Sequence, residues 1–73
     1  MSQDKLVYMA NQIGQAFNHQ PEAEAVASIA EHIKSFWDPR MRKAILNYKN
    51  AGGSGFRPRV SQALARLEEV NLL

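Results

Sequence analysis

Few side chains in this sequence are of the types that perform catalysis or bind metals. The only histidines are His19 and His32, and there is no cysteine, which excludes a thiolate metal site and a cysteine nucleophile. Glu31 and His32 are neighbours, and neighbouring side chains on a helix diverge by about 100°, which prevents an acid–base dyad. None of the five serines has a base at a suggestive spacing. The sequence therefore predicts no catalytic residue, no metal site and no cofactor site in this chain.

The basic residues are stronger candidates for a functional surface, because seven of the nine cations fall in the second half of the chain. They are Arg40, Arg42, Lys43, Lys49, Arg57, Arg59 and Arg66. A helix that reads nucleic acid presents its basic residues on one contiguous face. Here Leu46 interrupts that surface, which suits contact with a protein better, and the net charge of +2 is small. A solvated face and a small basic nucleic-acid-binding domain remain the alternatives.

Three of these cations directly follow Asp38 and Pro39, where the sequence predicts the start of a helix. Asp is a good helix cap, and proline is favoured at the first helical position. A helix start already carries positive partial charge, so Arg40, Arg42 and Lys43 are mildly unfavourable there. From the sequence we prefer a partner that binds these cations over a merely tolerated solvated face.

The glycine-rich stretch 51–56, A-G-G-S-G-F, could suggest a phosphate-binding loop. It lacks the G-x-x-x-x-G-K-[ST] pattern, and it follows a predicted helix, whereas such loops follow a strand. We therefore expect a helix stop and a flexible connector, with a partner-contacting loop as the alternative.

Apolar residues recur with the helical period in four segments, and no segment alternates in the manner of a half-buried strand. The segments begin near Ser2 or Asp4, at Pro21, at Pro39 and at Pro58. The residues expected to face inward are Leu6, Met9, Ala10, Ile13, Ala16 and Phe17; Ala23, Ala25, Val26, Ile29, Ala30, Ile33, Phe36 and Trp37; Met41, Ala44, Ile45 and Tyr48; and Val60, Ala63, Leu64, Leu67 and Val70.

Three apolar residues, Val7, Tyr8 and Leu46, fall outside these stripes and are expected on the surface. His32 is expected at the edge of the second stripe, as a boundary residue. The fold class predicted is all-α, a single small domain of about four short helices over residues 1–73. No apolar run approaches the roughly 20 residues that cross a bilayer, and the N-terminus is unlike a signal peptide. With no cysteine, we expect a cytoplasmic protein.

Four blocks of the sequence occur together in a known family. They are L-V-Y-M-A-N-Q-I (residues 6–13), A-V-A-S-I-A-E-H-I (residues 25–33), F-W-D-P-R-M-R (residues 36–42) and A-G-G-S-G (residues 51–55). With these blocks in this order, the chain resembles the delta subunit of soluble NAD-dependent formate dehydrogenase over nearly its whole length.

This resemblance implies a non-catalytic accessory subunit of a complex that oxidises formate to carbon dioxide and reduces NAD. The alpha subunit of that family holds a molybdenum or tungsten pterin and iron–sulfur clusters, and the beta and gamma subunits carry FMN and further clusters. The delta subunit is expected to dock on the alpha subunit, during assembly or in the finished complex. An exposed partner surface can also promote self-association when the partner is absent.

The expected partner-binding residues are Trp37, Asp38, Pro39, Arg40, Arg42, Leu46 and Tyr8. Asp38 is expected to cap and position the turn, while Arg40 and Arg42 meet carboxylates or carbonyls of the partner. For Trp37 the sequence leaves two roles open, and sealing the core is slightly favoured over direct contact with the partner.

Overall fold

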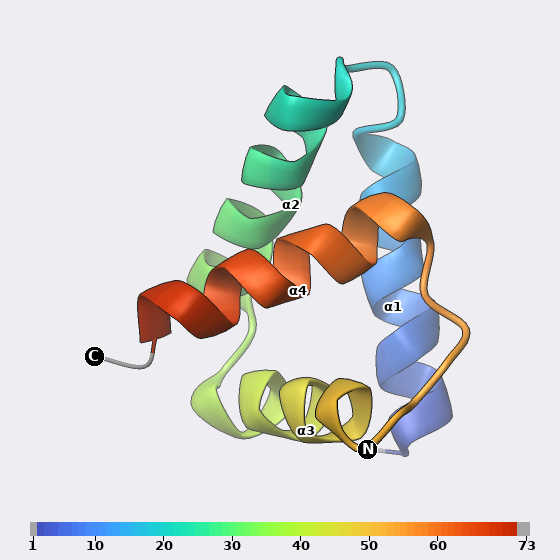
Figure 1. Cartoon of the computed structure of the whole chain (residues 1–73), viewed down its shortest axis with the longest axis vertical. Helices are drawn as coiled ribbons and strands as arrows, with labels where there is room; N and C mark the ends of the chain where they lie inside the picture. The colour runs from blue at the N-terminus through green and yellow to red at the C-terminus, as the bar shows by residue number, and fades with distance from the viewer. Residues whose placement is uncertain (1, 72–73) are drawn as a thin grey trace.

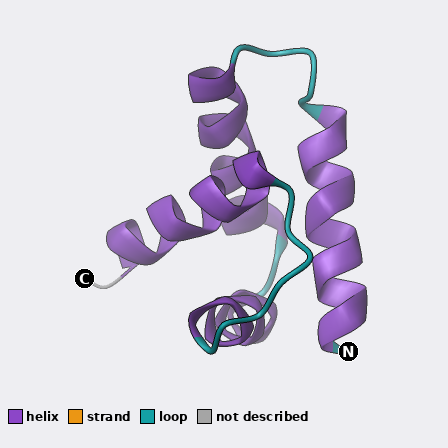
Figure 2. Cartoon of the chain, turned by 45° about the vertical axis from the view of Figure 1, so that its right-hand side comes forward, coloured by secondary structure: helices purple, strands orange, loops and turns teal. Residues whose placement is uncertain are grey.

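Four helices make up the structure, a computed structural model that describes residues 2–71. They are α1 (Gln3–Ala16), α2 (Glu22–Phe36), α3 (Pro39–Asn50) and α4 (Pro58–Asn71). α1 and α2 form an antiparallel pair joined at one end, α3 lies across the opposite end, and α4 crosses between them (Figure 1). A second view shows α3 nearly end-on beneath the other helices (Figure 2). The all-α prediction is confirmed, and the described part of the chain contains no strand.

The helix boundaries follow from local capping chemistry. The Ser2 hydroxyl accepts a hydrogen bond from the backbone N–H of Lys5, and Asp38 caps α3 with Pro39 in the first turn. Pro21 lies one position before α2 rather than inside it. α3 ends where Gly52 takes a φ of +89°, a conformation that suits glycine. These short-range signals explain why the boundaries agree with the sequence to within a few residues.

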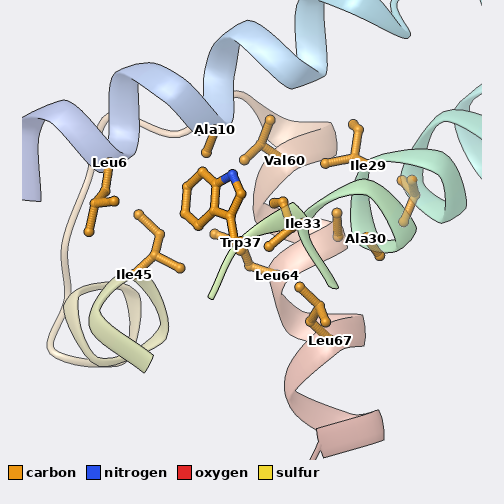
Figure 3. Packing of buried hydrophobic residues seen from close by; sticks show 12 residues of the cluster. Leu6, Ala10, Ile29, Ala30, Ile33, Trp37, Ile45, Val60, Leu64 and Leu67 are labelled. Atoms are coloured by element: carbon orange, nitrogen blue, oxygen red, sulfur yellow. The ribbon is translucent and has the colours of Figure 1, made fainter. Parts of the chain in front are cut away.

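The core lies where the four helices meet. Trp37, at the end of α2, is only 5% exposed, and its ring lies among side chains from all four helices (Figure 3). Its neighbours in the core cluster include Leu6, Ala10, Ile33, Ile45, Val60 and Leu64. The structure therefore favours the core-sealing role of Trp37 that the sequence had left open.

A glycine permits the close approach of α1 to α4. Gly14 is buried, and a Cβ atom built there would lie 2.6 Å from Cγ2 of Val60, which is closer than real Cβ contacts. Val60 is itself fully buried. The absence of a side chain at position 14 is therefore part of how the two helices pack.

Four residues expected in the core lie outside it, and one of them is Ala16, which is exposed at the end of α1. Phe36 is 75% exposed, because adjacent residues at the end of α2 diverge and Trp37 takes the inward direction. Val70 is 51% exposed and lines an open hollow between α2 and α4. Ala23 is exposed in the first turn of α2.

Two residues expected on the surface are instead half-buried. Leu46 packs against the core from the side of α3 that faces α4, and Val7 packs against it from α1. Both sit at the margins of their stripes, where a neighbouring element covers them. Tyr8, by contrast, is 63% exposed, as expected. Within residues 2–71, no helix is both long enough and apolar enough to cross a bilayer.

Candidate functional site

The turn between α2 and α3 is the part of the molecule to which the sequence assigned a function. Oδ1 of Asp38 accepts a hydrogen bond from the backbone N–H of Met41 over 2.9 Å, which caps α3. Trp37 is buried beneath the turn, while Asp38, Pro39 and Arg40 are exposed above it. Burial of Trp37 and the cap formed by Asp38 therefore fix the orientation of the start of α3.

Arg42 explains part of the unfavourable charge at the start of α3. Its guanidinium Nη1 donates to the carbonyl oxygen of Lys34 over 2.9 Å and to that of Trp37 over 2.7 Å. Carbonyls at a helix C-terminus lack partners within their helix and carry negative partial charge. Arg42 is therefore misplaced with respect to α3 but well placed with respect to the end of α2. From the sequence we expected Arg42 to meet carboxylates or carbonyls of a partner. In the structure it binds two carbonyls of its own chain.

Arg59 repeats this arrangement at the start of α4. Its Nη1 donates to the carbonyl oxygen of Gln20 over 2.8 Å and approaches that of Asn18 at 3.4 Å. Two members of the predicted basic set thus bond to carbonyls at helix ends and connections. This internal use weakens the case for a continuous basic track that follows a phosphate backbone.

The outward side of α3 presents a different set of residues, which we call the α3 face. It consists of Pro39, Arg40, Lys43, Asn47 and Asn50, all exposed. No acidic residue occurs in α3. The α3 face therefore carries two exposed cations, and of the two arginines predicted here only Arg40 stands on it. Lys43 was one of the three cations for which the sequence favoured a binding partner, although it was not among the seven named partner-binding residues, and its spacing of three from Arg40 places it on the same side of the helix.

Two open hollows flank the α3 face. The α4-side hollow, of about 520 Å³, is lined by Pro39, Arg42, Lys43, Leu46, Asn47, Asn50 and Glu68. The α1-side hollow, of about 480 Å³, is lined by Leu6, Asp38, Arg40, Met41 and Ala44. Each combines apolar side chains with a cation at its edge. The carboxylates at their edges are already engaged, Asp38 by Met41 and Glu68 by the side chain of Asn50.

Tyr8 is exposed on α1, about 200° around the helix from the buried Leu6. Its hydroxyl oxygen accepts a hydrogen bond from Nε2 of Gln12 over 2.6 Å. It lines neither hollow beside α3. The predicted residues therefore divide into a group around the α2–α3 turn and one separate tyrosine.

A second exposed feature is an aromatic patch on α2 that the sequence did not single out. The ring of His32 lies 4.7 Å from that of Phe36 and 6.3 Å from that of Phe17, measured between centroids. His32 is half-buried, which agrees with its expected place at the edge of the stripe. The spacing of four between His32 and Phe36 would have indicated this pairing.

The glycine-rich connection before α4 is anchored at several points. Nδ2 of Asn11 donates to the carbonyl oxygen of Gly55 over 2.8 Å, and the Tyr48 hydroxyl donates to that of Ser54 over 3.1 Å. Gly55 has a φ of +99°, and a Cβ at Gly53 would collide with the Tyr48 ring. The loop therefore uses its glycines for backbone conformation and close packing.

None of the residues 2–71 belongs to a group of three or more His, Cys, Asp and Glu side chains that could hold a metal ion. The fold and this surface thus define a small helical protein with an exposed basic helix. Over residues 5–64 of 73, the chain matches the family described as the NADH-dependent formate dehydrogenase delta subunit FdsD. The chain belongs to this family, and the resemblance seen in its four sequence blocks is confirmed. No curated protein and no solved structure matches it.

Proposed function

We propose that this chain is a non-catalytic accessory subunit that supports assembly or stability of a cytoplasmic NAD-dependent formate dehydrogenase by docking on its large catalytic subunit. In this proposal the pterin metal centre, the iron–sulfur clusters and the FMN all lie in the partner subunits. Formate oxidation and NAD reduction take place there as well.

The observation that carries the proposal is the α3 face in a member of the delta-subunit family. Its two cations, Arg40 and Lys43, are exposed beside hollows whose linings are partly apolar. Arginine is a frequent anchor of protein contacts, and the buried centre of a protein interface is more apolar than its rim. A domain of this size also has a small core, so a partner that binds only the folded form adds to its stability.

The proposal is tested by producing the formate dehydrogenase with and without this chain. We expect the complex made without it to have lower formate oxidation activity, a lower content of molybdenum or tungsten, or a lower melting temperature. Adding the purified chain afterwards separates two roles: a permanent stabiliser restores the melting temperature, whereas an assembly factor does not restore metal content. If activity, metal content and melting temperature are all unchanged, the accessory role is wrong.

A further inference from the structure

We infer that the α3 face binds an acidic, amphipathic segment of the large subunit, whose carboxylates meet Arg40 and Lys43 while its apolar side chains enter the two flanking hollows. This inference rests on the proposed docking and specifies the chemistry of the partner surface.

Charge is the first argument. Arg42 is held by the carbonyls of Lys34 and Trp37, so the positive charge offered outward by the start of α3 comes from Arg40 and Lys43. Arg40 lies in the first turn of α3, where a cation is disfavoured by the helix itself, and Lys43 follows one turn later on the same side. A partner carboxylate would offset that local cost and form charge-assisted hydrogen bonds with the arginine fork.

The hollows supply the second argument. They lie on opposite sides of the same helix and share its exposed ridge, with the half-buried Leu46 in one lining and the half-buried Met41 and Ala44 in the other. A phosphate backbone makes no use of the apolar side chains in these linings, whereas a protein segment with apolar side chains of its own buries them. The surface therefore fits an acidic protein segment better than nucleic acid.

A second copy of this chain fits the α3 face poorly. A two-fold dimer would bring this face against itself, and because α3 contains no acidic residue, Arg40 and Lys43 would gain no carboxylate of α3 across the contact. Pairing the face with an acidic region elsewhere on the chain would be head-to-tail, and such contacts form rings or open polymers rather than a closed pair. The fitting occupant is a different protein with carboxylates at the contact.

The test is a double charge reversal, Arg40→Glu with Lys43→Glu, measured as the affinity of the full chain for the purified large subunit. Arg40 lies in the first turn of α3, where glutamate is favourable, and Lys43 is exposed in the next turn, so we expect these changes not to weaken α3, and circular dichroism of the variant checks this. The matched control is Arg57→Glu with Arg66→Glu, which makes the same change in net charge at exposed positions outside α3. We expect the α3 reversal to weaken binding about tenfold or more at low salt, and the control by about threefold or less.

The apolar part of the inference is tested separately. Ala44→Gln places a longer polar side chain in the α1-side hollow, and Ala51→Gln makes the same change at the exposed end of α3. We expect Ala44→Gln to weaken binding by a factor that hardly changes with salt, whereas the effect of the charge reversal shrinks as salt rises. Circular dichroism of each variant checks that the helical content is retained.

The possible outcomes are distinguishable. If the wild-type chain binds the large subunit and the α3 reversal binds equally well, this inference is wrong while the proposed docking stands. If both reversals weaken binding equally, net charge rather than the α3 face controls affinity, and the inference also fails. If the wild-type chain does not bind the large subunit, both proposals fail. Salt-sensitive binding of duplex DNA, or dimerisation in sedimentation velocity, that is lost in the α3 reversal would assign the face to another occupant.

Discussion

Asn11 in α1 holds the backbone at Gly55, 44 positions further along the chain, through a hydrogen bond of 2.8 Å from its side-chain amide. Its Oδ1 also accepts the backbone N–H of Arg57 over 3.0 Å. One side chain thus ties the connection between α3 and α4 to α1. Two of the sequence blocks that mark the family, residues 6–13 and 51–55, meet in this contact.

Replacing Asn11 by alanine removes both hydrogen bonds at once. Each is worth about 0.5–1.5 kcal/mol, so we expect Asn11→Ala to lower the free energy of unfolding by about 1–2 kcal/mol. Urea denaturation followed by circular dichroism measures the change. Gln12→Ala is the control, because its hydrogen bond to Tyr8 is exposed, and we expect it to cost about 0.5 kcal/mol or less. Equal losses in the two variants would show that Asn11 does not anchor the loop.

Gly14→Ala tests the contact between α1 and α4. Alanine is a better helix former by about 1 kcal/mol, but its Cβ would lie 2.6 Å from Cγ2 of Val60. We expect the overlap to dominate, with a net loss of about 1–3 kcal/mol in the free energy of unfolding. The double variant Gly14→Ala with Val60→Ala removes the overlapping methyl group and should be less destabilised than the sum of its single changes. Additive losses would contradict the close packing described here.

Arg42 and Arg40 should differ in their effect on stability although they are only two positions apart. Arg42→Ala leaves the carbonyls of Lys34 and Trp37 without their donor, and we expect it to lower the free energy of unfolding by about 1–2 kcal/mol. Arg42→Lys keeps the positive charge but lacks the planar guanidinium group, so we expect it to retain only part of the stability that Arg42→Ala loses. Arg40→Ala should change stability by about 0.5 kcal/mol or less. Thermal and urea unfolding of the three variants would reveal any reversal of this order.

The adjacent aromatics Phe36 and Trp37 should behave in opposite ways. Trp37 is 5% exposed and Phe36 is 75% exposed. We expect Trp37→Ala to cost about 3–5 kcal/mol and Phe36→Ser about 1 kcal/mol or less. Trp37→Phe is a smaller change, and we expect its loss of stability to lie between those two values. It allows the comparison to be made even if Trp37→Ala does not fold. A large loss from Phe36→Ser would mean that the aromatic patch contributes to the core.

Self-association of the isolated chain is a further expectation connected with Phe36. Exposed apolar patches favour association in the absence of a partner. Sedimentation velocity over a range of concentrations should show less association for Phe36→Ser than for the wild-type chain. Tyr8→Ser is a suitable comparison, since Tyr8 is also an exposed aromatic but lies on α1. An equal reduction in both variants would mean that the association is not specific to the patch on α2.

Helix type, helix number and most of the core could be predicted from the sequence. Pro39, Pro58 and Gly52 mark helix ends through their own backbone geometry. Core residues recur with the helical period within each helix, as Ile29 and Ile33 do in α2. Residues at the margin of a stripe were less predictable. Leu46 and Val7 are covered by neighbouring elements, and Phe36 is left exposed because the helix ends beside it.

The candidate site divides in the same way. The sequence by itself determined that α3 begins at Asp38 and Pro39, that cations follow at once, and that the chain has no cysteine, because these properties depend on residue identity and short-range spacing. Only the tertiary structure decided which cation faces inward and which outward. Arg42 turns to the end of α2 because unpaired carbonyls lie there, whereas Arg40 and Lys43 remain on the exposed α3 face. The periodicity of one helix carries no information about where another helix ends. The inward direction of Arg42 and the outward direction of Arg40 and Lys43 therefore depend on how the helices pack.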